Sequence, residues 1–108
     1  MRDESHVSGA DAATEGDVEM AMSEARARLL EVPAEIVVVN HAMGLWELAA
    51  IHLAADEPDL TAAKLAIDAM AAIVDDLGDR LGEDAATMRD ALSNIRMAFV
   101  SVRSRTND

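Results

Sequence analysis

The chain contains no cysteine and no tyrosine, and only one tryptophan and one phenylalanine among its 108 residues. Without cysteine there is neither a disulfide framework nor a thiolate metal site, which fits a reducing compartment. Two aromatic side chains offer no stacking platform for nucleic-acid bases. Basic residues are also scarce: Lys and Arg number 9 against 21 Asp and Glu, a formal net charge of −12. Phosphate backbones would be repelled, so we expect no direct nucleic-acid binding and favour a basic protein as a partner.

The first residues, MRDESHVSGADAATEGD, are acidic and contain no apolar run. We therefore expect neither a signal peptide nor an anchor, and a cytoplasmic location. Residues 1–16 hold too little apolar surface to offset the entropy of ordering, which predicts a disordered acidic tail. A helical bundle domain is expected over 17–103, followed by a flexible C-terminus at 104–108.

Strand patterns are missing from the sequence, because apolar and polar residues nowhere alternate over a sustained run. Alanine, the best helix former, is abundant. The sequence predicts an all-α fold: an antiparallel bundle of three long helices plus a shorter N-terminal helix. Helical periodicity begins at Asp17 and stops at Pro33, which forces the preceding residue out of the helical region. The next helix is expected to run to about Ala55.

The third and fourth predicted helices carry apolar residues at alternating steps of three and four, the repeat of a packed helical seam. The first seam consists of Leu60, Ala63, Ile67, Met70, Val74, Leu77 and Leu81. The second consists of Ala85, Met88, Leu92, Ile95, Phe99 and Val102. A short connection through Gly82 predicts an antiparallel pair, which brings the acidic end of the third helix near Arg89 and Arg96.

The segment IVVVNHAMGLWELAAIHLAA, residues 36–55, is apolar on almost every side. A charged residue at the centre of a membrane span costs roughly 2.5 to 3.5 kcal/mol, so the central Glu47 favours a soluble helix and no membrane contact. One side of this helix forms a seam for the core. The other side is mixed and more apolar than a small monomeric bundle needs, which predicts a homodimer interface. Its residues are Val37, Asn40, His41, Gly44, Glu47, Leu48 and Ile51. The alternative is that the helix at 17–31 folds back and covers this side.

No catalytic residue, cofactor or metal site is predicted. His41 and His52 lie about three turns apart, too far to share one metal ion. The acidic pairs lie near helix ends, where a solvated surface is the simpler interpretation. The leading hypothesis is therefore a non-enzymatic interaction module. The alternative function is a small-molecule or metal-binding bundle that uses a polar cluster of the second helix, namely Asn40, His41, Trp46 and Glu47.

EVPAEIVVVNHAMGLWELAAIHLA and LTAAKLAIDAMAAIVDDLGDRLGEDAATMRDALSNIRMAFV together resemble a small bacterial family of actinobacterial type, domain of unknown function 1844. The resemblance spans about residues 31–102 and lies in hydrophobic patterns, with no catalytic signature. It implies a small helical cytoplasmic protein. Actinobacterial relatives are often encoded beside translation initiation factor 3 and two large-subunit ribosomal proteins, which implies a link with the translation apparatus.

Overall fold

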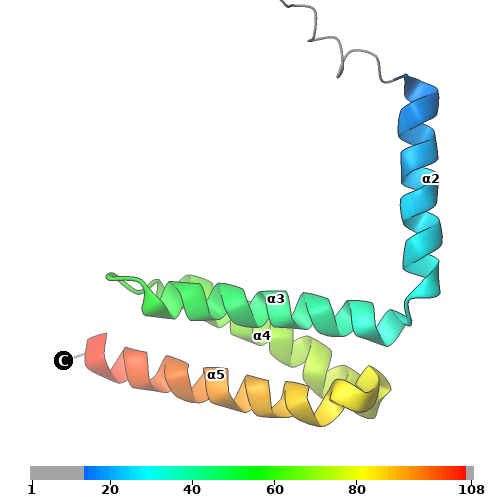
Figure 1. Ribbon diagram of the computed structural model, residues 1–108. Coiled ribbons are helices and arrows are strands. Elements are labelled where there is room, and N and C mark those ends of the chain that lie inside the picture. Colours follow the sequence, from blue (N-terminus) through cyan, green and yellow to red (C-terminus); the bar gives the residue numbers. More distant parts are fainter. Residues whose placement is uncertain (1–13, 107–108) are drawn as a thin grey trace, which may run out of the picture. The chain divides into compact units, whose positions relative to one another are not determined.

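The computed structural model describes residues 14–106, and within that range all regular secondary structure is helical. The all-α prediction is therefore confirmed. Figure 1 shows the elements in chain order. They are α2 (Glu15–Glu31), α3 (Ala34–Ala54), α4 (Leu60–Leu77), the 3₁₀ segment η1 (Gly78–Asp84) and α5 (Ala85–Thr106).

The chain divides at Pro33 into two compact units, Met1–Pro33 and Ala34–Asp108. The predicted helical bundle domain, residues 17–103, extends across this division. Among the described residues, α2 contributes no buried residue, whereas every buried core residue belongs to the second unit.

A capping box starts α2. The Thr14 hydroxyl accepts a hydrogen bond from the backbone N–H of Asp17 at 3.1 Å, and the Asp17 carboxylate accepts one from the backbone N–H of Thr14 at 3.3 Å. Because this reciprocal pair satisfies two otherwise unpaired donors, the helix begins at Glu15 and not at Asp17. The predicted disordered tail 1–16 is thus wrong for its last residues, and residues 1–13 lie outside the described part. The helix ends before Val32, as expected from Pro33.

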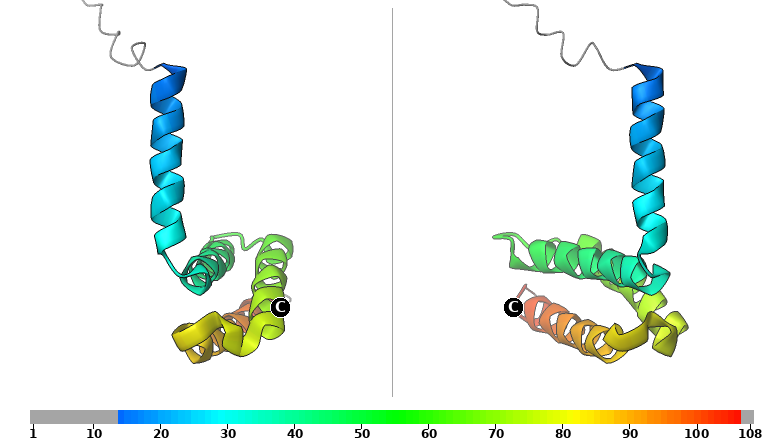
Figure 2. Two further views of the ribbon diagram at one scale, coloured as in Figure 1. Left: turned by 90° about the vertical axis from the view of Figure 1, so that its right-hand side faces the viewer. Right: turned by 45° about the vertical axis from the view of Figure 1, so that its right-hand side comes forward.

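The second unit consists of three helices that pack against one another. All three pairs among α3, α4 and α5 are in contact, and helices adjacent in sequence run in opposite directions (Figures 1 and 2). Every residue of the two predicted seams on α4, η1 and α5 is buried or half-buried. Met70, Leu81 and Val74 are the largest fully buried side chains. The alternating three and four steps therefore identified the core side of these elements.

Alanines of α3 and α4 belong to the buried core. Ala42 and Ala49 of α3 and Ala63 of α4 are each 0% exposed. A methyl side chain allows two helix backbones to approach closely, so the spacing of these helices depends on small residues as well as on large ones.

Turn chemistry sets the helix ends of this unit. The Asp59 carboxylate caps α4 by accepting from the backbone N–H of Ala62 at 2.9 Å. Gly78, with φ of 51°, ends α4, and Gly82, with φ of 81°, interrupts η1. A Cβ at Gly82 would also lie 3.2 Å from Cγ of Glu35, so both its backbone and its surroundings favour glycine.

Ion pairs join the acidic end of α4 and η1 to α5, as the sequence predicts. Arg89 donates to Asp79 at 2.7 Å, and the Arg96 guanidinium lies 3.6 Å from the Asp75 carboxylate. All four side chains are substantially exposed, so each pair contributes less than about 1 kcal/mol. They favour one register over others more than they stabilise the fold.

The last helix extends further than predicted. α5 runs to Thr106, so residues 104–106 of the predicted flexible C-terminus are helical, and 107–108 lie outside the described residues. Arg103 and Arg105 lie in its last turn, where positive charge complements the negative end of the helix dipole. The Thr106 hydroxyl also donates to the carbonyl of Arg103 at 3.0 Å.

Candidate functional site

The seven residues predicted as an interface form one side of α3, which we call the outer face. Ile51 is 66% exposed and Leu48 44% exposed, an unusual loss of contact for two large aliphatic side chains. The complete set is Val37, Asn40, His41, Gly44, Glu47, Leu48 and Ile51, of which only Val37 is half-buried and the others are exposed. Their steps of three and four place them on one side of the helix.

The opposite side of α3 faces the core. Val39, Ala42, Ala49 and Leu53 are buried there. Trp46 belongs to this side too, because its indole Nε1–H donates to the carbonyl of Ala91 in α5 at 3.0 Å. This hydrogen bond therefore links α3 to α5.

Trp46 is thus separated from the other three members of the polar cluster proposed as a ligand site. Trp46 lies nine positions after Val37, a residue of the outer face. At 100° per residue this is two and a half turns, so Trp46 points away from Val37. Trp46 lies on the core side, whereas Asn40, His41 and Glu47 are exposed on the outer face. Within residues 14–106 no group of three or more His, Asp or Glu side chains is placed to hold a metal ion.

Gly44 lies at the middle of the outer face. A Cβ built at this position would meet nothing within 4 Å beyond its own helix backbone. Glycine inside a helix destabilises it by roughly 0.5 to 1 kcal/mol relative to alanine. The described chain gains no packing in exchange for that cost. What the missing side chain offers is room for another backbone to approach the helix.

One polar group of the outer face is already bonded within the helix. Nδ1 of His41 lies 2.8 Å from the carbonyl oxygen of Val37, one turn earlier. A carbonyl only accepts, so Nδ1 carries the hydrogen and donates it, which leaves Nε2 as the nitrogen for another partner.

α3 is also the described helix whose length and apolar composition would suffice to cross a membrane. Its mean hydropathy reaches 1.4 in the most apolar window, of which 22% is buried. Helices in the cores of soluble proteins meet the same two criteria. The feature that separates this helix from an ordinary span is the row Asn40, His41 and Glu47 on its exposed side.

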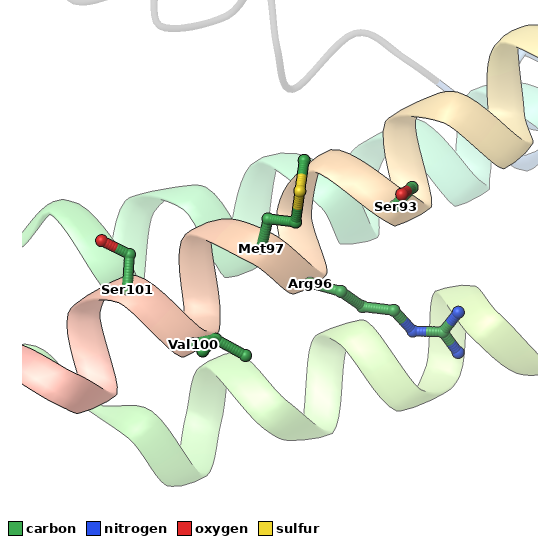
Figure 3. Close-up of a pocket in the computed structure, with 5 residues that line it drawn as sticks. All are labelled: Ser93, Arg96, Met97, Val100 and Ser101. Carbon is green, nitrogen blue, oxygen red and sulfur yellow. The ribbon is translucent and has the colours of Figure 1, made fainter.

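A second apolar patch lies on α4 and α5. Leu65 is 73% exposed, Met97 62% and Val100 48%. Figure 3 shows the shallow hollow beside it, in which Arg96 extends toward α4, in agreement with its ion pair to Asp75. The hollow is lined by Ser93, Arg96, Met97, Val100 and Ser101.

Sequence reasoning missed Met97 and Val100 as surface residues. Both fall between the seam positions Ile95, Phe99 and Val102, and this off-seam apolar character was the signal that could have identified them. Arg103, the third arginine of the series Arg89, Arg96 and Arg103, lies over the Phe99 ring with its guanidinium carbon 5.7 Å from the ring centroid.

Models of protein families, curated proteins and solved structures all gave no match to this chain. What the outer face does must therefore be argued from its own chemistry.

Proposed function

We propose that this protein is a non-enzymatic helical interaction module of the cytoplasm that forms a homodimer through the outer face of α3. In this proposal α3, α4 and α5 act as an antiparallel bundle, and the shorter α2 precedes it. The observation that carries the proposal is the combination of two exposed aliphatic residues, Leu48 and Ile51, with Gly44, whose missing side chain leaves open space. Apolar area removed from water drives association, and a central glycine permits close contact.

The chemistry of the outer face favours a polypeptide as its occupant. Lipid tails would leave Asn40 and Glu47 without hydrogen-bond partners, which is costly away from water. A second helix supplies both apolar side chains and polar groups along its length. A homodimer is favoured further because a twofold interface needs one self-complementary surface only.

Substitution of Gly44 by leucine tests the homodimer. In wild type, light scattering should give twice the chain mass of 11.5 kDa. Gly44→Leu should raise the dissociation constant at least about tenfold, because a branched side chain in the middle of the face holds the helices apart. The variant should remain as helical as wild type by circular dichroism, since the added side chain meets open space.

Leu65→Ser is the matched control, because it removes an exposed aliphatic residue from the other apolar patch and should leave the dimer intact. A monomeric wild type removes the proposal. That result is expected if α2 is what covers α3. Dissociation by Leu65→Ser together with an intact Gly44→Leu dimer assigns the interface to the patch on α4 and α5 instead.

We further propose a basic protein, in the setting of translation, as a second partner. Exposed acidic residues gather at both connections of the second unit: Asp56, Glu57 and Asp59 follow α3, and Glu83 and Asp84 precede α5. With a net charge of −12, this surface attracts positively charged proteins. The resemblance to the family encoded beside ribosomal proteins supports the setting.

Co-sedimentation with ribosomes tests this second partner. The protein should sediment with ribosomes at low ionic strength and be released at about 0.5 M salt, because attraction between exposed charges is screened there. A Glu83→Gln, Asp84→Asn variant should bind more weakly at low salt. Absence from the ribosomal pellet at low salt contradicts the proposal, as does retention at high salt.

A further inference from the structure

The outer face of α3 repeats every seven residues, as a helix-pairing surface does. Val37, Gly44 and Ile51 form its middle row, with Gly44 midway between the other two. Asn40 and Glu47 form the row on one side of it, and His41 and Leu48 the row on the other. The positions of these residues are therefore nearly symmetric about Gly44, but the residue types on the two sides of Gly44 differ.

We infer that two copies of α3 pair antiparallel, with the twofold axis of the dimer passing beside Gly44. This inference rests on the proposed homodimer and adds its orientation and register. In an antiparallel pair, a residue that precedes Gly44 by some number of positions lies at the same height along the helix axis as the residue of the second copy that follows Gly44 by that number. Val37 then meets Ile51 of the second copy, and the two glycines meet each other.

The same register places polar groups at one level. A twofold axis perpendicular to the helices sets each flanking row beside the same row of the second copy. Asn40, four residues before Gly44, therefore lies beside Glu47 of the second copy, within about 1.5 Å along the helix axis. The Glu47 carboxylate, which only accepts, thus lies beside the Asn40 amide, whose NH₂ group donates.

Orientation is decided by charge. A parallel pair would set each Glu47 level with Glu47 of the second copy, two like charges across one interface. It would also align the two helix dipoles. An antiparallel pair separates the two carboxylates along the helix axis and opposes the dipoles, which is the favourable arrangement. The charge pattern therefore favours the antiparallel dimer.

Apolar contact follows the same register. The aliphatic side chains of Val37 and Ile51 cover each other at both ends of the interface, and the glycines at the axis let the helix backbones approach. In a parallel pair, by contrast, Gly44 would again meet Gly44, but Asn40 would have to share its level with Asn40 of the second copy. Apolar contact alone permits both orientations, so the polar residues select one of them.

Engineered cysteines test the orientation, because the natural chain has none. Val37→Cys and Ile51→Cys each place a thiol in the middle row, about 10 Å along the helix from Gly44 and on opposite sides of it. In the antiparallel dimer, neither variant alone should form a disulfide under mild oxidation, since its two thiols lie about 21 Å apart along the axis. An equimolar mixture should cross-link up to about half of the chains, the fraction that forms mixed dimers.

A mismatched mixture of Val37→Cys and Asn40→Cys serves as the control and should not cross-link. Light scattering on each reduced sample establishes that the variants still form dimers. Should a cysteine at position 37 or 51 dissociate the dimer, Asn40→Cys with Glu47→Cys repeats the test, because these two residues share a row and come within about 1.5 Å of each other along the axis.

The outcomes separate the two proposals. Disulfides within single-variant samples show a parallel pair, which overturns the register and leaves the homodimer standing. Dimers by light scattering without any cross-link also overturn the register, because the interface then lies elsewhere. Monomeric samples at every concentration overturn the homodimer itself.

Discussion

Replacing Met70 by alanine should lower the free energy of unfolding of the second unit by about 3 kcal/mol, within the range of roughly 2 to 5 kcal/mol measured for such truncations in cores. Met70 is 0% exposed and lies on α4, which packs against both α3 and α5. The truncation removes apolar contact and leaves a cavity that the surrounding helices fill only in part. Urea unfolding followed by far-ultraviolet circular dichroism measures the loss.

Leu65→Ala is the control for Met70→Ala. Both residues are on α4, but Leu65 is 73% exposed, so its truncation should change the stability by less than about 0.5 kcal/mol. Comparable losses for the two variants would contradict the assignment of Met70 to the core. A large loss for Leu65→Ala alone would show that its patch is covered in solution.

Enlarging Ala49 to leucine should destabilise the second unit by about 3 kcal/mol, the upper end of what overpacking costs. Ala49 is 0% exposed on the side of α3 that faces the core, so three added carbon atoms must displace a neighbouring helix. For a domain of this size, such a loss lowers the melting temperature by more than about 10 °C. Calorimetry or thermal circular dichroism provides the measurement.

Ala72→Leu is the matched control for Ala49→Leu, because Ala72 is exposed on α4 and the same enlargement there meets solvent. Its melting temperature should stay within a few degrees of wild type. An unchanged melting temperature for Ala49→Leu would mean that α3 does not pack closely on its neighbours. The close approach described for the alanines would then be wrong.

The side of α4 and α5 that faces the core could be predicted from the sequence because the signal is periodic. Residues such as Ile67, Val74 and Ile95 recur at the helical repeat, and burial of one side is what selects that repeat. The outer face of α3 could be delineated for the same reason. Once Val39 and Leu53 are assigned to the core, the residues half a turn away must be exposed.

Helix ends were harder to predict, since they depend on single hydrogen bonds and single dihedral angles. The apolar seam continues from Leu77 to Leu81 without a break, so it conceals the positive φ of Gly78 that ends α4. The capping box of Thr14 and Asp17 was hidden in a segment whose composition suggests disorder. The division at Pro33 could not be predicted either, because a weakly amphipathic helix indicates no particular neighbour.

The role of Trp46 shows a different limit. The alternative function groups it with Asn40 and Glu47, whereas the structure has it on the side of α3 that faces the core. Only one assignment is compatible with helical geometry, and the hydrogen bond to Ala91 identifies which. Met97 and Val100 lie off the regular seam of α5, so the periodic signal that marks the core side does not locate them.

The indole that joins α3 to α5 also makes the chain its own optical reporter. Trp46 is the sole tryptophan and there is no tyrosine, so ultraviolet fluorescence arises almost entirely from one ring. That ring is held against a carbonyl of α5. A shift in the tryptophan emission will therefore report when these two helices separate, without any added dye. It will not report on α2, which contains no tryptophan.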